Sequence, residues 1–168
     1  MARFGQTLTA MITPFTSDDA LDVEGAAKLA KWLVEQGNEG LVIAGTTGES
    51  PTLTHDEQIE LVSTVAEAVS VPVIAGTGSN DTRAAIELTE RATQAGADAV
   101  LVVAPYYNRP SQTGIYAHFE AIAMSTDLPV VLYDIPGRTG RKMATETIVR
   151  LAQIPNVVAL KDLSLIHI

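Results

Sequence analysis

Six short apolar runs at nearly regular intervals constrain the fold of this 168-residue chain more than any other feature. They are rich in valine, isoleucine and leucine and cover residues 7–12, 40–43, 71–75, 99–103, 129–133 and 157–160. From the second run onward, the last aliphatic residues, at positions 43, 75, 103, 132 and 160, lie 32, 28, 29 and 28 residues apart. Continuous runs of this length and composition are typical of strands buried on both faces of a parallel sheet.

Amphipathic segments between the runs predict helices, which we expect over 23–36, 54–70, 81–95, 113–126 and 144–153. Gly37 is placed to end the first helix, and Thr54 and Glu57 have the spacing of a capping box. The alternation predicts an α/β fold. Because no glycine-rich dinucleotide fingerprint follows the first run, this alternation of strands and helices favours a (β/α)8 TIM barrel over a Rossmann sheet. Such barrels usually need about 250 residues, so we expect an incomplete barrel with about six βα units and two open edges.

Composition excludes several classes of partner. The 11 basic and 20 acidic side chains give a net charge of −9, which argues against a surface for nucleic acid or anionic membrane. There is no cysteine and the three histidines are scattered, so no disulfide framework and no metal site are expected. No run approaches the roughly 18 apolar residues of a membrane span. The first residues lack a secretory signal, and we expect a cytoplasmic protein without membrane contact.

Lys161 closes the last apolar run and is the first candidate for catalysis. A free lysine amine has a pKa of about 10.4 and is protonated at neutral pH. Burial among apolar neighbours lowers this pKa and gives the neutral amine that attacks a carbonyl to form an imine. The alternatives are an ion pair with Asp162 or a side chain that snorkels to solvent.

Polar and glycine residues also follow the second and fourth runs, at the strand ends where barrels of this class form their active sites. The segment 45–50, Gly-Thr-Thr-Gly-Glu-Ser, allows a tight turn whose N–H groups and threonine hydroxyls bind a carboxylate. It also fits a simple helix-capping loop. Tyr107, in the loop after the fourth run, is either a phenol that relays protons with Thr47 or a packing residue.

The fifth run ends at Tyr133 and is followed by a second candidate loop. Pro136 and Gly137 predict a turn that presents Arg138 as a fork suited to a carboxylate. A solvated surface arginine is the alternative.

Taken in order, four motifs resemble the dihydrodipicolinate synthase family of the pyruvate-dependent class I aldolase superfamily. They are Gly45-Thr46-Thr47-Gly48-Glu49, Pro105-Tyr106-Tyr107, Tyr133-x-x-Pro136-x-Arg138-Thr139-Gly140 and Lys161. The resemblance runs from about Gln6 to Asp162. It implies 4-hydroxy-tetrahydrodipicolinate synthase activity, the condensation of pyruvate with L-aspartate-4-semialdehyde through a lysine imine, on the route to lysine and diaminopimelate. It also implies that no metal or organic cofactor takes part.

The resemblance assigns a role to each catalytic candidate. Lys161 forms the imine with pyruvate, and Tyr133 beside it donates and accepts protons. Thr47 links Tyr133 to Tyr107 in a proton relay, and Tyr107 reaches across a tight dimer into the neighbouring subunit's site.

The substrate-binding roles follow from the same resemblance. Thr46 and Thr47 hold the pyruvate carboxylate, and Arg138 binds the carboxylate of aspartate semialdehyde. The full-length protein is expected to be a homotetramer built from tight dimers, with small molecules as its substrates.

Two other hypotheses remain open. N-acetylneuraminate lyases and sugar-acid aldolases resemble the chain elsewhere but generally lack an arginine at the place of Arg138. A non-catalytic binding module on a barrel fragment is the alternative of another class, and we expect the chain to be inactive alone. Residues 163–168 do not resemble the family's continuation, so we expect a partial catalytic domain over 1–162 and a tail over 163–168.

Two departures from the family pattern concern single residues. Asp134 stands where many relatives have Asn, which leaves the catalytic residues in place. Ala84 stands where lysine-inhibited members have an acidic residue, so inhibition by lysine is not expected.

Overall fold

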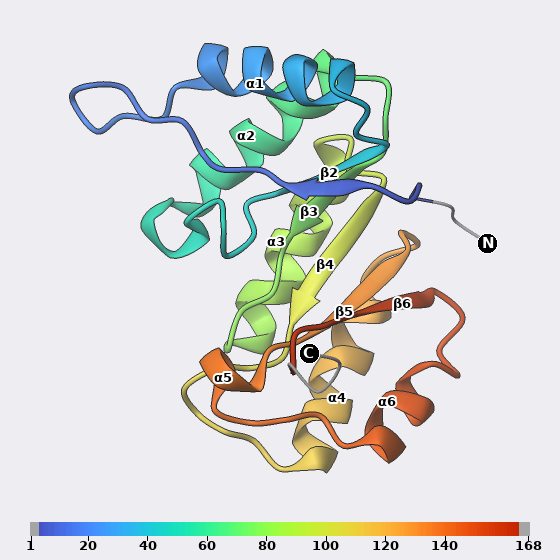
Figure 1. Ribbon diagram of the computed structural model, residues 1–168. Helices are drawn as coiled ribbons and strands as arrows, with labels where there is room; N and C mark the ends of the chain where they lie inside the picture. Colours follow the sequence, from blue (N-terminus) through green and yellow to red (C-terminus); the bar gives the residue numbers. More distant parts are fainter. Residues whose placement is uncertain (1–3, 165–168) are drawn as a thin grey trace. The chain divides into compact units, whose positions relative to one another are not determined.

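The computed structural model describes residues 4–164, which form six strands and the helices that connect them (Figure 1). The strands lie in the sheet in chain order, β1-β2-β3-β4-β5-β6. Their bounds are β1 Leu8–Ala10, β2 Gly40–Ile43, β3 Val73–Gly76, β4 Ala99–Val103, β5 Val130–Asp134 and β6 Val157–Asp162. The helices are α1 Val23–Glu35, the 3-10 turn η1 Ser50–Thr52, α2 His55–Ala68, α3 Thr82–Gln94, α4 Gln112–Ala123, α5 Pro136–Thr139 and α6 Thr145–Leu151.

The described residues divide into two compact units. The N-terminal unit comprises residues 4–76 and 91–99, and the C-terminal unit comprises residues 77–90 and 100–164.

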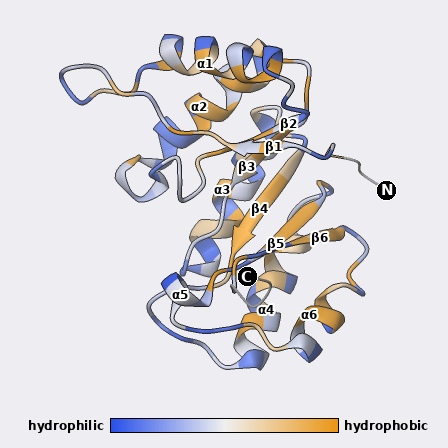
Figure 2. Ribbon diagram, in the orientation of Figure 1, coloured by the Kyte–Doolittle hydropathy of each residue, from blue (hydrophilic) through white to orange (hydrophobic). Residues whose placement is uncertain are grey.

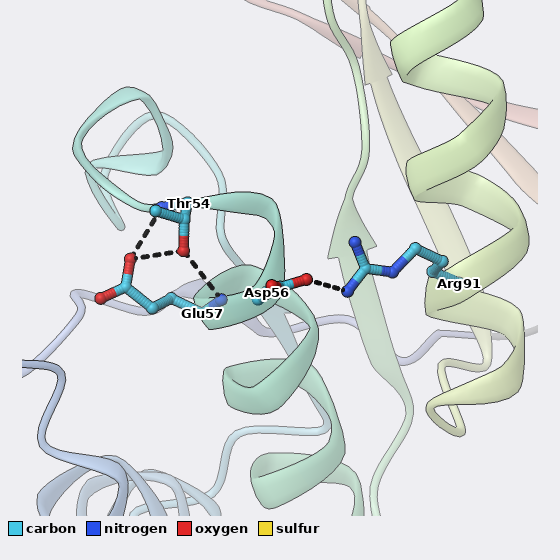
Figure 3. Close-up of polar contacts among 4 residues, drawn as sticks. All are labelled: Thr54, Asp56, Glu57 and Arg91. Carbon is cyan, nitrogen blue, oxygen red and sulfur yellow. Dashed lines mark hydrogen bonds and ion pairs between the residues drawn. The ribbon is translucent and has the colours of Figure 1, made fainter.

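In the N-terminal unit, β1, β2 and β3 pair in parallel and helices α1 and α2 pack against each other. The capping box predicted for α2 is present: the Thr54 hydroxyl accepts from the Glu57 N–H, and the Thr54 N–H donates to the Glu57 carboxylate (Figure 3). Asp56, in the first turn of α2, forms an ion pair with Arg91 at 2.6 Å (Figure 3). Because the Asp56 side chain is 89% exposed, this pair contributes little to stability.

In the C-terminal unit, β4, β5 and β6 pair in parallel, and α4 packs against α6. The strands are the most apolar segments of this unit (Figure 2). The core combines strand residues with the inner faces of the helices, and its fully buried members include Val100, Val102, Ile115, Phe119, Ile122, Val130, Leu132, Met143 and Leu151. Removing this much apolar surface from water is the main stabilising contribution to the unit.

The predicted elements are confirmed, with shifts at their ends. Strands β2 and β4 have the predicted bounds, whereas β1 is three residues long where six were expected. Strand β6 continues beyond Leu160 to Asp162, so Lys161 lies within the strand and not after it. β6 is also not buried on both faces, because Val158 is 42% and Leu160 38% exposed. Such exposure is expected at the last strand of an incomplete barrel.

Among residues 4–164, no helix has the length and apolar character needed to span a membrane.

Candidate active site

Lys161 and Tyr133 lie opposite each other on adjacent strands of the C-terminal unit. The Lys161 Nζ atom is 4.5 Å from the centroid of the Tyr133 ring, and Tyr133 is only 4% exposed. Burial lowers the pKa of Lys161 below its ordinary value, because an ammonium loses hydration inside the protein. The pair therefore combines an amine that deprotonates more readily than a free lysine with a phenol beside it.

An irregularity in β6 sets this pairing. The register of β5 and β6 shifts by one residue between Val130 and Val131, so that Val158 of β6 has no opposite residue in β5. Without the extra residue, the same pairing would place Leu160 opposite Tyr133. Since a slip of one residue moves a side chain to the other face of a strand, the bulge at Val158 decides that Lys161 meets Tyr133.

Asp134, the residue after Tyr133, is a buried carboxyl whose placement the sequence did not indicate. It is 1% exposed, and its Oδ1 accepts a hydrogen bond from the Met143 N–H at 3.3 Å. Burial raises the pKa of Asp134, the Met143 hydrogen bond opposes this shift, and the charge of Asp162, opposite it in the register, adds to it. The hydrogen bond from the Met143 N–H to Asp134 thus connects the two ends of the segment between β5 and Met143.

Arg138 lies within the four-residue helix α5, where its side chain is exposed. Pro136 occupies the first turn, as predicted, but the interpretation of Gly137 as a residue that fixes the turn is wrong. A Cβ at Gly137 would meet no atom within 4 Å, whereas Gly140 ends α5 with a left-handed φ of 72°. A Cβ at Gly140 would also lie 2.8 Å from Nε of Arg109, so Gly140 is the glycine that this turn requires.

Tyr107 lies in the loop between β4 and α4 and is 89% exposed. Its φ is 71°, and that of Arg109 is 45°, both unusual for residues that carry a Cβ. Asn108 between them donates a side-chain hydrogen bond to the Asn80 carbonyl at 3.1 Å. Strained backbone of this kind costs about 1–3 kcal/mol per residue and is concentrated at functional loops.

Thr46 and Thr47 belong to the N-terminal unit, in the loop after β2. The loop is a tight turn, in which the Glu49 N–H donates to the Thr46 carbonyl at 3.1 Å. The buried Thr13 hydroxyl donates to the Gly48 carbonyl at 2.6 Å, and a Cβ at Gly48 would lie 3.0 Å from a backbone oxygen. Both Thr46 and Thr47 are exposed, so the turn leaves their side chains open to a ligand.

Of the predicted site residues, the structure brings Lys161 and Tyr133 into contact within the C-terminal unit, which also contains Tyr107 and Arg138. Within residues 4–164, no group of three or more metal-ligating side chains is present. The predicted tail at 163–168 lies for the most part outside the described residues. Leu163 continues the pattern of β6 by donating its N–H to the Asp134 carbonyl at 2.8 Å.

Comparison with known proteins decides the family. Residues 3–165 match the model of the dihydrodipicolinate synthetase family. The chain belongs to this family. The 4-hydroxy-tetrahydrodipicolinate synthase of Acidothermus cellulolyticus is 58% identical over 163 residues, which are 96% of this chain and 53% of that protein. The chain thus spans about half the length of the curated family members that it matches.

Solved structures of family members agree with the fold. A dihydrodipicolinate synthase of Bacillus anthracis superimposes with a TM-score of 0.95 at 52% identity, covering 96% of this chain and 56% of its own. The enzyme of Acinetobacter baumannii, solved as a complex with pyruvate, gives 0.93 at 45% identity, covering 95% and 56%. The predicted fold class, an incomplete TIM barrel, is therefore confirmed.

Proposed function

We propose that this chain supplies the imine-forming part of a 4-hydroxy-tetrahydrodipicolinate synthase, which condenses pyruvate with L-aspartate-4-semialdehyde. The observation that carries the proposal is the half-buried Lys161 amine 4.5 Å from the centroid of the buried Tyr133 ring. The family membership and the names of the curated relatives support it, since several are 4-hydroxy-tetrahydrodipicolinate synthases at 54–58% identity.

The chemistry begins at the Lys161 nitrogen. The neutral amine attacks C2 of pyruvate, the carbinolamine takes up a proton at its hydroxyl, and water leaves to give the imine. Loss of a proton from C3 gives an enamine, whose carbon attacks the aldehyde of the second substrate. Hydrolysis then returns the free lysine, and the product cyclises with loss of water. Tyr133, whose ring lies beside the Lys161 amine, is proposed to carry protons to and from the carbinolamine.

The other site residues bind the substrates and complete the relay. We assign Thr47 as the link between Tyr133 and Tyr107, and Thr46 with Thr47 as the donors that hold the pyruvate carboxylate. The exposed hydroxyls of the turn after β2 support this assignment. Arg138 is assigned to the second carboxylate, for which a planar guanidinium is well suited. The imine formed on Lys161 serves as the electron sink in this scheme, so no metal or organic cofactor is required.

The full-length protein is proposed to be a cytoplasmic homotetramer of tight dimers, in which Tyr107 enters the neighbouring subunit's site. The 89% exposure of Tyr107 on a strained loop supports a role in contact with another subunit.

Product formation tests the proposal. Because the chain spans about half of its relatives, the test uses a full-length form, made by continuing residues 1–162 with the C-terminal part of the Acidothermus relative. We expect it to consume pyruvate only when aspartate semialdehyde is present. Thr46→Val should weaken binding of the pyruvate carboxylate alone, whereas Thr47→Val should weaken this binding and also slow proton transfer. Cleavage of N-acetylneuraminate without condensation would favour the lyase alternative. If a folded full-length form shows neither activity, the result would favour a non-catalytic binding module.

A further inference from the structure

Gln112, the first residue of α4, joins two segments that are distant in the sequence. Its Nε2 donates to the Lys142 carbonyl at 2.9 Å. Its Oε1 accepts from the Ala144 N–H at 2.9 Å and from the Thr147 hydroxyl at 2.8 Å. The chemistry of these partners fixes the orientation of the amide, because a carbonyl needs a donor and an N–H needs an acceptor.

The segment held by Gln112 is the one that carries Arg138. We call residues 135–144 the Arg138 loop. In the middle of this loop, the buried Thr139 hydroxyl donates a shared hydrogen bond to the carbonyls of Ile135 and Arg141, at 3.2 and 3.0 Å. At the C-terminal end of the loop, the Lys142 carbonyl and the Ala144 N–H both form hydrogen bonds with the Gln112 side chain.

Two further contacts connect the same loop to the segment that contains Tyr107. The Nε of Arg141 donates to the Pro110 carbonyl at 3.1 Å, and the guanidinium of Arg109 lies against Gly140. Gln112 follows Pro110 by two residues, so the Gln112 amide and the Arg141 side chain both tie the Arg138 loop to the segment 110–112, where α4 begins. These contacts are all within the C-terminal unit.

We propose that Gln112 is a positioning residue that fixes the Arg138 loop for the carboxylate of the second substrate. This role rests on the proposed function, because Arg138 is there the carboxylate ligand. Gln112 needs no contact with substrate to do this. Tyr133 and Lys161 are held by the register of β5 and β6, and the hydrogen bonds of Gln112 go to neither strand, so we expect pyruvate imine formation to change less than binding of the second substrate.

The choice of residue type gives a graded test. Gln112→Ala removes all three hydrogen bonds, while Gln112→Glu keeps both acceptor bonds and places a carboxylate oxygen against the Lys142 carbonyl. Thr147→Val removes one partner and keeps its shape, which provides a milder variant if the first two fold poorly. Gln153→Ala is the matched control, since Gln153 is an exposed glutamine just after α6 whose Nε2 donates to the Val149 carbonyl at 3.4 Å.

The first measurement does not require activity. Hydrogen exchange of the 168-residue chain should show the Ala144 amide exchanging about tenfold faster in Gln112→Ala, as expected for the loss of a few modest hydrogen bonds. The Gln112→Glu variant should protect Ala144 nearly as well as the original chain. Unchanged exchange at residues 140–147 in Gln112→Ala would refute the fastening role.

The second measurement uses the full-length form. We expect the KM for aspartate semialdehyde to rise about tenfold in Gln112→Ala, while the KM for pyruvate and the rate of imine trapping change less than about twofold. Equal effects on both substrates, or faster exchange with no change in either KM, would refute the positioning role. If the unsubstituted form makes no pyruvate adduct, the proposed function fails and the substrate role fails with it. The exchange data alone then decide whether Gln112 fastens the loop.

Discussion

Replacing His118 should remove the loss of stability in acid that comes from burying this one histidine in its neutral form. His118 lies in α4, is 5% exposed, and bonds through Nδ1 to the Thr82 hydroxyl at 2.9 Å. Its Nε2 is buried and has no hydrogen-bond partner among residues 4–164, and the ring meets Phe119 edge-on. Burial lowers the pKa of His118 from 6.5 to about 4, and the nearby charge of Asp81 offsets part of this shift.

The sign of the effect follows from proton binding. Between pH 6.5 and about 4, the unfolded chain binds a proton at His118 that the folded chain does not, so stability falls as the pH falls through this window. For a single site, this difference amounts to about 2 kcal/mol at pH 5 relative to pH 7. His118→Gln keeps a polar group for Thr82 but does not titrate, so it should lose this dependence.

Urea unfolding followed by circular dichroism at pH 7 and pH 5 measures the effect. We expect the loss of unfolding free energy between the two pH values to be about 2 kcal/mol smaller in His118→Gln than in the original chain. His55→Gln, at an exposed histidine, is the matched control substitution. If His118→Gln and the original chain lose the same stability within about 0.5 kcal/mol, burial of a neutral His118 is wrong.

Three further predictions concern the site. Tyr133→Phe keeps the ring beside Lys161 but removes the hydroxyl, so borohydride trapping of the pyruvate imine should slow by about 10²- to 10³-fold; an unchanged rate would exclude Tyr133 as the proton carrier. Because burial lowers the pKa of Lys161, the trapping rate should rise with pH to an inflection below about 10.4, and an inflection at or above the value of free lysine would contradict the burial argument. Gly140→Ala should destabilise the chain by about 1–3 kcal/mol in thermal unfolding, because of its left-handed φ and the approach of Arg109. Gly137→Ala should be neutral or slightly stabilising, and equal losses at the two glycines would refute this argument.

The order of the strands and helices along the chain could be predicted well from the sequence. Each strand is a continuous apolar run, which can be recognised without knowing which strands lie beside it. Lys161 could be selected for the same reason, as a charged residue at the end of such a run. Its partner could not be derived from the pattern alone, since the bulge at Val158 depends on how β6 pairs with β5.

The residues that sequence reasoning missed act through tertiary contacts. Asp134 was noted only as a substitution for Asn, and its burial and its bond to Met143 appear only when the loop folds back onto β5. Gln112 looks like an ordinary helix-start residue until its partners, 30 to 35 positions away, are known. The exchange of roles between Gly137 and Gly140 has a similar cause, because both fit a turn and only the backbone geometry distinguishes them.

Mapping a reduced pyruvate adduct tests the central claim most directly. The chain has four lysines, Lys28, Lys31, Lys142 and Lys161. The full-length form should be incubated with pyruvate, reduced with borohydride, digested and analysed by mass spectrometry. The account predicts an adduct on Lys161 alone, and no adduct in Lys161→Arg. An adduct spread over the exposed lysines, or none at Lys161 in a correctly folded full-length protein, would contradict it.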